Sequence, residues 1–102
     1  MAEQALRLTP GQRRYLKQHA HHLKILLQMG KDGPTSAFVK QLLETLQAHE
    51  LVKLRVLGNC LAEPAEIEGA FAAAQITVVQ KVGHIYTVFK QREDESIFNL
   101  PL

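Results

Sequence analysis

Hydrophobic residues along the chain follow the helical period in three stretches, and strand-forming residues gather in four others. The helical stretches begin near Thr9, Thr35 and Pro64. Thr9 can cap the first of them, and a proline suits the first turn of the first and the third. The clearest period runs from about Thr35 to Ala48, and its apolar residues are Phe38, Val39, Leu42, Leu43 and Leu46. The strand-like segments are residues 24–29, 50–57, 76–82 and 84–91, and Gly83 indicates a tight hairpin between the last two.

These segments predict the order helix, strand, helix, strand, helix, strand, strand. Strands joined through a helix run parallel by right-handed crossovers, and two crossovers in the same direction place both connecting helices on one sheet face. We therefore predict a two-layer α/β fold with a four-stranded mixed sheet. Alternation predicts which residues of a strand share a face. In the second strand, Val52, Leu54 and Val56 share one face, and the other face holds Leu51, Lys53, Arg55 and Leu57. In the first strand, Ile25, Leu27 and Met29 share a face.

Length and composition fit one domain. The chain has 102 residues, of which 46% are hydrophobic, and we expect a single domain over 1–102 with its core at about 8–91 and a tail at 92–102. No apolar stretch approaches the roughly 20 residues of a membrane span, and residues 1–8 lack the hydrophobic segment of a signal peptide. The single Cys60 cannot form an internal disulfide. We expect a soluble, cytoplasmic monomer.

The sequence favours neither catalysis nor metal binding. His19, His21 and His22 cluster, but no spacing supplies the further donors that a zinc site needs. No serine lies in a Gly-x-Ser-x-Gly turn, and Cys60 has no evident base nearby. We expect no enzyme, no metal, no cofactor and no small-molecule substrate.

Positive charge is concentrated in the first part of the chain. The formal net charge is only +2, yet residues 1–60 hold nine Lys/Arg and four Asp/Glu, whereas residues 61–102 hold three and six. Such asymmetry indicates a surface that faces nucleic acid, or else random clustering on a soluble surface. The totals leave both interpretations open.

A glycine loop, Gly30-Lys31-Asp32-Gly33, separates the first strand from the second helix. Glycine at each end lets the backbone come close to a ligand, Lys31 supplies charge, and the next helix directs amide donors outward. Two glycines three residues apart are also common in ordinary turns. The loop therefore suits a phosphate backbone without requiring one.

Further basic residues are placed so that they can join this loop. They are Arg13, Arg14 and Lys17 on one side of the first helix, Lys24 beside the first strand, and Lys53 and Arg55 on the second strand. If the first helix packs beside these strands, the cations and the loop form one face, and each cation can neutralise a phosphate. The alternative is a solvated sheet face.

Five segments carry a resemblance that covers nearly the whole chain: LTPGQRRYL (8–16), HHLK (21–24), QMGKDGPT (28–35), HELVKLRV (49–56) and QKVGH (80–84). Together they resemble the CRM domain, an RNA-binding module of chloroplast splicing and ribosome-maturation proteins, in its stand-alone bacterial YhbY-like form. The family's fold is similar to the C-terminal domain of bacterial translation initiation factor three.

The resemblance implies binding to structured RNA, and specifically to ribosomal RNA in precursors of the large ribosomal subunit. It implies RNA contacts at the loop from Gly30 to Gly33 and at Arg14, Lys24, Lys31, Lys53 and Arg55. Two departures are Pro34, where the family usually has leucine, and His84, where it usually has arginine. An alternative function is a protein-interaction module that docks a basic ribosomal protein through its acidic C-terminal half.

Overall fold

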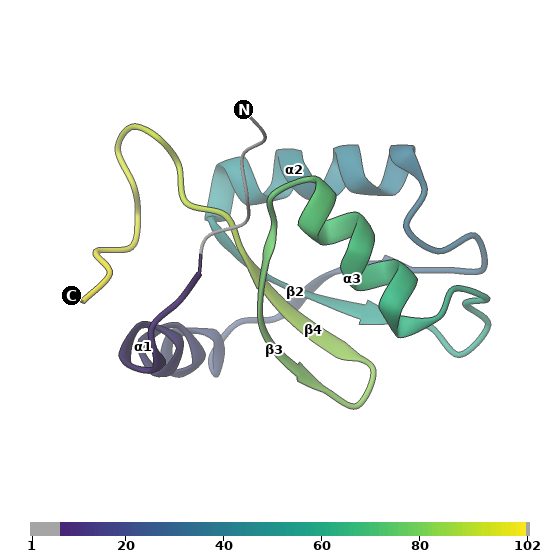
Figure 1. Ribbon diagram of the computed structural model, residues 1–102, viewed down its shortest axis with the longest axis horizontal. Helices are drawn as coiled ribbons and strands as arrows, with labels where there is room; N and C mark the ends of the chain where they lie inside the picture. The colour runs from purple at the N-terminus through teal and green to yellow at the C-terminus, as the bar shows by residue number, and fades with distance from the viewer. Residues whose placement is uncertain (1–6, 102) are drawn as a thin grey trace.

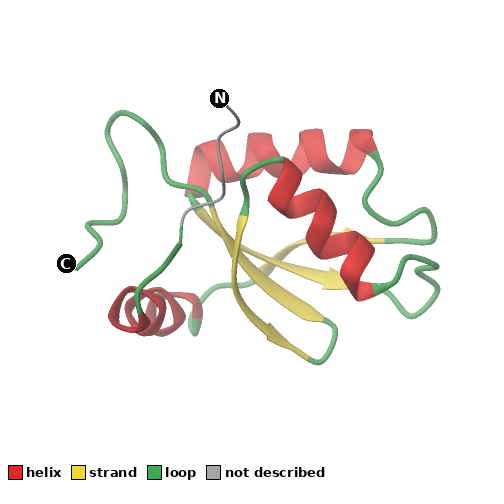
Figure 2. Ribbon diagram, in the orientation of Figure 1, coloured by secondary structure: helices red, strands yellow, loops and turns green. Residues whose placement is uncertain are grey.

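The computed structural model of the chain describes residues 7–101. Residues 1–6 and 102, which the single-domain and signal-peptide predictions include, lie outside the described part. The elements are α1 (Pro10–Ala20), β1 (Ile25–Met29), α2 (Ser36–His49), β2 (Leu51–Val56), α3 (Pro64–Ala73), β3 (Thr77–Val82) and β4 (Ile85–Phe89) (Figures 1 and 2). The predicted element order is confirmed. Among the described residues, no helix is long and apolar enough to cross a membrane.

The four strands form one mixed sheet in the order β1-β2-β4-β3. Strand β1 runs parallel to β2, and β4 lies antiparallel to both β2 and β3. Both crossover helices, α2 and α3, cover the same face, as the right-handed crossover rule predicts (Figure 1). The α/β fold with three helices and a mixed sheet is therefore confirmed.

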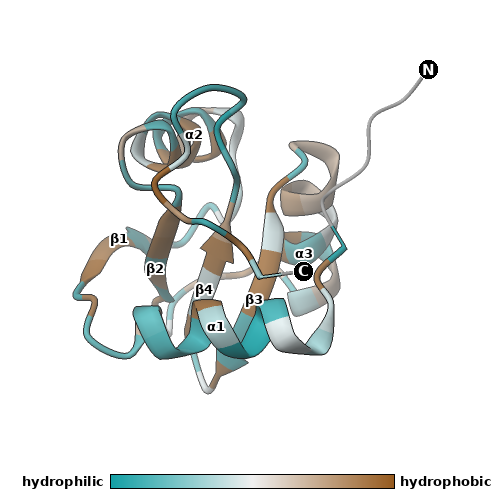
Figure 3. Cartoon of the chain, turned by 90° about the vertical axis from the view of Figure 1, so that its left-hand side faces the viewer, coloured by the Kyte–Doolittle hydropathy of each residue, from teal (hydrophilic) through white to brown (hydrophobic). Residues whose placement is uncertain are grey.

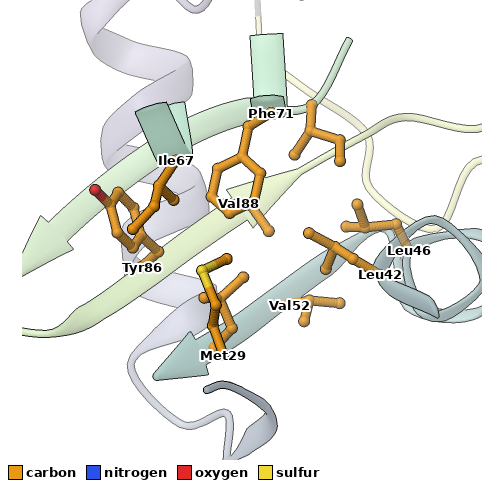
Figure 4. Packing of buried hydrophobic residues seen from close by; sticks show 10 residues of the cluster. Met29, Leu42, Leu46, Val52, Ile67, Phe71, Tyr86 and Val88 are labelled. Atoms are coloured by element: carbon orange, nitrogen blue, oxygen red, sulfur yellow. The ribbon is translucent and has the colours of Figure 1, made fainter. Parts of the chain in front are cut away.

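The main core lies between the sheet and the helices α2 and α3. Apolar residues from alternate positions of β2 and β4 meet one stripe from each helix (Figure 4). The buried members of this cluster are Met29, Leu42, Leu46, Val52, Leu54, Ile67, Phe71, Ile76, Tyr86 and Val88. We call this side of the sheet the closed face.

Helix α1 lies on the opposite side of the sheet, which we call the open face. Its buried residues Leu16 and Ala20 pack against Leu51, Val79 and Phe89. The predicted two layers therefore describe only the sheet with α2 and α3, and α1 adds a partial third layer. The reason is that the outward side of β2 begins with an apolar residue and continues with cations, so one short helix suffices to cover its apolar end.

Two register shifts change which side chains reach each face. A shift between Ile25 and Leu27 in β1 sends Ile25 to the side of Lys53, while Leu27 and Met29 stay with the core. The prediction that Ile25 shares a face with Leu27 and Met29 is thus wrong, because a bulge inserts an extra residue and reverses the alternation. A second shift, between Val78 and Gln80 in β3, brings Val79 under α1.

The C-terminal tail is attached to the domain by a buried carboxylate. Glu50 is 0% exposed, and its carboxylate accepts hydrogen bonds from the backbone N–H groups of Arg92, Ile97 and Phe98 and from the hydroxyl of Ser96. Burial alone would raise the pKa of Glu50, but these hydrogen bonds outweigh it and hold the pKa below the ordinary 4.5. Glu50 is therefore ionised at neutral pH and holds the tail by charge-assisted hydrogen bonds.

The tail in turn supports α1 and α2. The Phe98 ring makes edge contacts with the rings of Tyr15, His19 and Phe89. The guanidinium of Arg92 donates to the carbonyls of Gln47 and Ala48, at the negative end of α2. Residues after β4 thus fasten α1 to the sheet, although their sequence shows no period.

Candidate nucleic-acid interface

The glycine loop is a tight turn that the fold itself requires. Gly33 N–H donates to the Gly30 carbonyl at 3.1 Å, and Gly33 has φ +69°, in the region that favours glycine. A Cβ on Gly33 would lie 2.8 Å from the Cβ of Ala62. Internal packing therefore explains Gly33, for which we predicted the close approach of a ligand.

Gly30 differs from Gly33 in both respects. A Cβ at Gly30 would meet no atom within 4 Å, and its φ lies outside the left-handed region. Neither internal packing nor backbone strain therefore requires glycine there. The close approach of a ligand at Gly30 stays a prediction.

The turn is fixed to the loop that follows β2. Leu57 N–H donates to the Met29 carbonyl at 2.9 Å, and Leu61 N–H donates to the Lys31 carbonyl at 3.2 Å. Figure 1 shows the two loops side by side at one edge of the sheet. The backbone of the turn is held from inside, so the exposed side chains of Lys31 and Asp32 are directed to solvent from a rigid support.

A groove lies between the end of α1 and the part of the open face that α1 leaves uncovered. Its cavity volume is about 280 Å³, and we call it the basic groove. The residues that line it are Lys17, Ala20, His21, Lys53, Gln80, Val82, Ile85 and Thr87. Figure 3 shows α1 running across in front of the strands, with much of its ribbon in the teal of hydrophilic residues.

The second strand extends the positive charge from the groove toward the glycine turn. Along its outward side, Leu51 lies under α1, Lys53 lines the groove, and Arg55 follows about 7 Å further on, at two residues of strand rise. Arg55 pairs with Gln28, two residues before Gly30. We call Lys17, Lys53, Arg55 and Lys31 the cationic path: the first three lie on the open face, and Lys31 lies in the turn at the end of the neighbouring strand β1.

The cations of this path have no internal partner. Within residues 7–101, no ion pair and no side-chain hydrogen bond involves Lys17, Lys53, Arg55 or Lys31. Arg14 and Lys24 are likewise exposed, Arg14 on the outside of α1 and Lys24 just before Ile25, which pairs with Lys53. Their charge is thus available to an external anion.

Arg13 has a different role from the one that we predicted. It is half-buried, and its guanidinium donates to the carbonyls of Val78 and Val79 at the bulge of β3. The helical wheel places Arg13 beside Arg14 and Lys17, but its position near Leu16 and Ala20 turns it inward. The structure therefore uses Arg13 to hold α1 on the sheet.

Negative charge lies on the other side of the sheet. The first part of α3 and the residue before it expose Glu63, Glu66 and Glu68, and α3 covers the closed face. Glu68 also accepts a 2.8 Å hydrogen bond from the Tyr86 hydroxyl. Burial, followed by this hydrogen bond and the charge of Glu68, raises the pKa of Tyr86 to about 12. The two faces of the sheet thus differ in sign.

No group of three or more His, Cys, Asp or Glu side chains within residues 7–101 is arranged to hold a metal ion. His19 instead packs against the rings of Tyr15 and Phe98. The chemistry that the open face can perform is the binding of an anion through fixed positive charge.

Fold and groove together define a small α/β domain with a cationic face suited to polyanions. The chain belongs to the CRS1/YhbY (CRM) domain family, whose model matches residues 8–90. This confirms the family that the five sequence segments indicate.

Several relatives match over nearly the full chain. The "probable RNA-binding protein YqeI" of Bacillus subtilis is 34% identical, with 92% of this chain and 99% of the relative covered. The "probable RNA-binding protein MJ0652" of Methanocaldococcus jannaschii is also 34% identical, over 89% of this chain and 69% of the relative. The solution structure of SAV1595 from Staphylococcus aureus matches with a TM-score of 0.72 and 28% identity, over 93% of this chain and all of the other.

Sequence reasoning missed two polar residues of the groove, Gln80 and Thr87. Both lie within strand-like runs, where a polar residue is ordinarily assigned to a solvated face. Thr87 is only 3% exposed, yet it lines the groove. The one signal in the sequence was the alternation of Thr87 with Ile85 and Phe89. This alternation places Thr87 on the same face of the sheet as the cations of β2.

Proposed function

We propose that this protein is a non-catalytic RNA-binding protein that holds the phosphate backbone with the basic groove, Arg55 and Lys31. The observation that carries the proposal is the cationic path, whose side chains have no partner within residues 7–101. A polyanion that neutralises these cations releases its condensed counterions, which gives a favourable and salt-dependent binding free energy. The names of the relatives, which describe RNA-binding proteins, support the same conclusion.

The glycine turn adds to this surface. Gly30 leaves space beside the backbone of the turn, and Lys31 projects next to it. A phosphate can approach the backbone at Gly30 more closely than a side chain would permit. Asp32, which is exposed in the same turn, is part of the proposed RNA contact.

Within RNA, we propose ribosomal RNA in precursors of the large subunit as the target, which the resemblance to YhbY-like proteins implies. Cross-linking in cells, followed by mapping of the linked nucleotides, tests this target. A discrete position in large-subunit RNA supports it, and links spread over unrelated transcripts contradict it.

The binding face is tested by salt titration with matched variants. We expect the RNA affinity of the intact chain to fall steeply with added salt, and the combined variant Lys31→Ala, Lys53→Ala, Arg55→Ala to flatten that dependence. Lys40 is an exposed cation of α2 on the closed face, so Lys40→Ala removes one positive charge elsewhere and is the matched control for each of the three substitutions made singly. Equal RNA binding by the triple variant would reject this face and favour protein docking through the acidic half.

A further inference from the structure

The floor of the basic groove is not built like a surface for phosphates alone. Besides the cations Lys17 and Lys53, it contains the apolar side chains of Val82 and Ile85 and the polar side chains of Gln80 and Thr87. Val82 is 61% exposed, which is high for a branched apolar residue in a strand. Such a mixture of an apolar floor and a few polar groups is typical of small-ligand sites.

The polar groups of this floor have no internal partner. Neither Thr87 nor Gln80 makes a side-chain hydrogen bond to another residue in the described range 7–101. Thr87 is nearly buried, and its hydroxyl opens into the groove. Since no side-chain polar atom of the described residues is both buried and unpaired, the Thr87 hydroxyl is open to solvent in the groove, where it is free to bond to a polar group that enters.

A second hollow of the molecule provides a contrast. It has a cavity volume of about 200 Å³ and lies between the loop after β2 and the β3–β4 hairpin, near Tyr86. There the Tyr86 hydroxyl is bonded to Glu68, and the Lys81 ammonium lies 5.5 Å from the centre of the Tyr86 ring. The Tyr86 hydroxyl and the Lys81 ammonium of that hollow therefore already have contacts within the protein.

We propose that the basic groove holds one unpaired nucleobase of the bound RNA. The base lies on Val82 and Ile85, and its polar edge bonds to Thr87 and Gln80. Lys17 and Lys53 hold the flanking phosphates. At about 280 Å³ the groove is just below the roughly 300 Å³ at which small-ligand pockets begin, which suits a single ring system.

This inference rests on the proposed function and specifies the kind of RNA. In an A-form duplex the bases are stacked and paired, so their edges cannot enter a groove of this size. A splayed base in a loop, bulge or single strand can enter it. We therefore infer that the protein binds RNA containing unpaired nucleotides in preference to continuous duplex.

The test compares two probes with the intact chain, a 12-nucleotide RNA strand of randomised sequence and a blunt duplex of 12 base pairs. At equal salt concentration, we expect the single strand to bind more tightly, although the duplex carries about twice as many phosphate groups. Thr87→Val keeps the shape and removes only the hydroxyl. It should weaken single-strand binding roughly three- to tenfold, the size of one net hydrogen bond, and leave duplex binding and the salt dependence unchanged.

Gln80→Ala provides a second variant, and Gln41→Ala, at an exposed position on α2, is its matched control. Melting temperatures exclude variants that fail to fold. If single strand and duplex bind equally and both groove variants bind like the unmodified protein, the nucleobase site is rejected while RNA binding stands. If no variant and no probe shows salt-dependent RNA binding, the proposed function itself fails.

Discussion

The closed and open faces of the same sheet show how one small domain divides its residues between folding and binding. On the closed face, two helices bury a continuous apolar cluster that includes Phe71 and Val88. On the open face, α1 covers only the apolar end of β2. Further along that strand, Lys53 lines the groove and Arg55 lies beyond it. A helix too short to cover a sheet thus leaves a groove, and the residues left uncovered set the chemistry of that groove.

Among the residues that maintain the fold, Gly33 is the one whose substitution we expect to lower stability most. We expect Gly33→Ala to lower the free energy of unfolding by at least about 2 kcal/mol, because it combines a left-handed backbone with a 2.8 Å approach to Ala62. Urea unfolding followed by circular dichroism measures this change. A variant as stable as the unmodified protein would show that the turn is not held by packing.

The anchor at Glu50 tests whether the tail belongs to the fold. Glu50→Gln removes the charge but keeps the shape, and we expect a loss of about 2 kcal/mol at pH 7 as charge-assisted hydrogen bonds weaken.

The same substitution carries a pH dependence with a fixed sign. Since the pKa of Glu50 is depressed below 4.5 in the folded state, its contribution is fully present above that value and is lost as pH falls through the folded pKa. The stability difference between the two proteins should therefore shrink in acid below pH 4.5. A difference that stays constant from pH 7 into that range would contradict the assignment.

Arg13 and Lys17, four residues apart on α1, sharpen the comparison between structural and free cations. Arg13→Ala removes the hydrogen bonds to β3, and we expect a loss of about 1 to 2 kcal/mol in stability.

Lys17→Ala should leave the melting temperature unchanged and reduce the slope of log affinity against log salt by about 0.7 to 0.9, the value for one phosphate. Thermal melts and RNA titrations of both variants separate the two roles. The assignment of a structural role to Arg13 and a binding role to Lys17 is wrong if Lys17→Ala destabilises the protein as much as Arg13→Ala does.

Gly30→Ala is expected to have the smallest effect on the fold. Since a Cβ there meets open space at an ordinary φ, the melting temperature should stay the same or rise slightly through reduced freedom of the unfolded chain. RNA affinity should fall severalfold, because the added methyl group occupies the space beside the turn. Unchanged affinity in an RNA titration would mean that no ligand approaches Gly30 closely.

Much of the fold follows from local patterns in the chain. The cap predicted at Thr9 is confirmed, because its hydroxyl accepts the backbone N–H of Gln12. Thr35, where the second helix was predicted to begin, caps α2 in the same way through the N–H of Phe38. Alternation in β2 assigned Lys53 and Arg55 to the face opposite Val52 and Leu54. The bulges in β1 and β3 were not foreseen, because the extra residue is set by pairing with a neighbouring strand and leaves no local signal.

The amino-acid sequence by itself determined the elements, their order, the family and the group of cations, since periodicity, capping and motif spacing are properties of neighbouring residues. Tertiary structure alone decided the side of the sheet that α1 covers, the inward turn of Arg13, the internal reason for Gly33 and the tail anchor at Glu50. Each of these depends on contacts between residues far apart in the chain. Packing and desolvation select such contacts only once the sheet has formed.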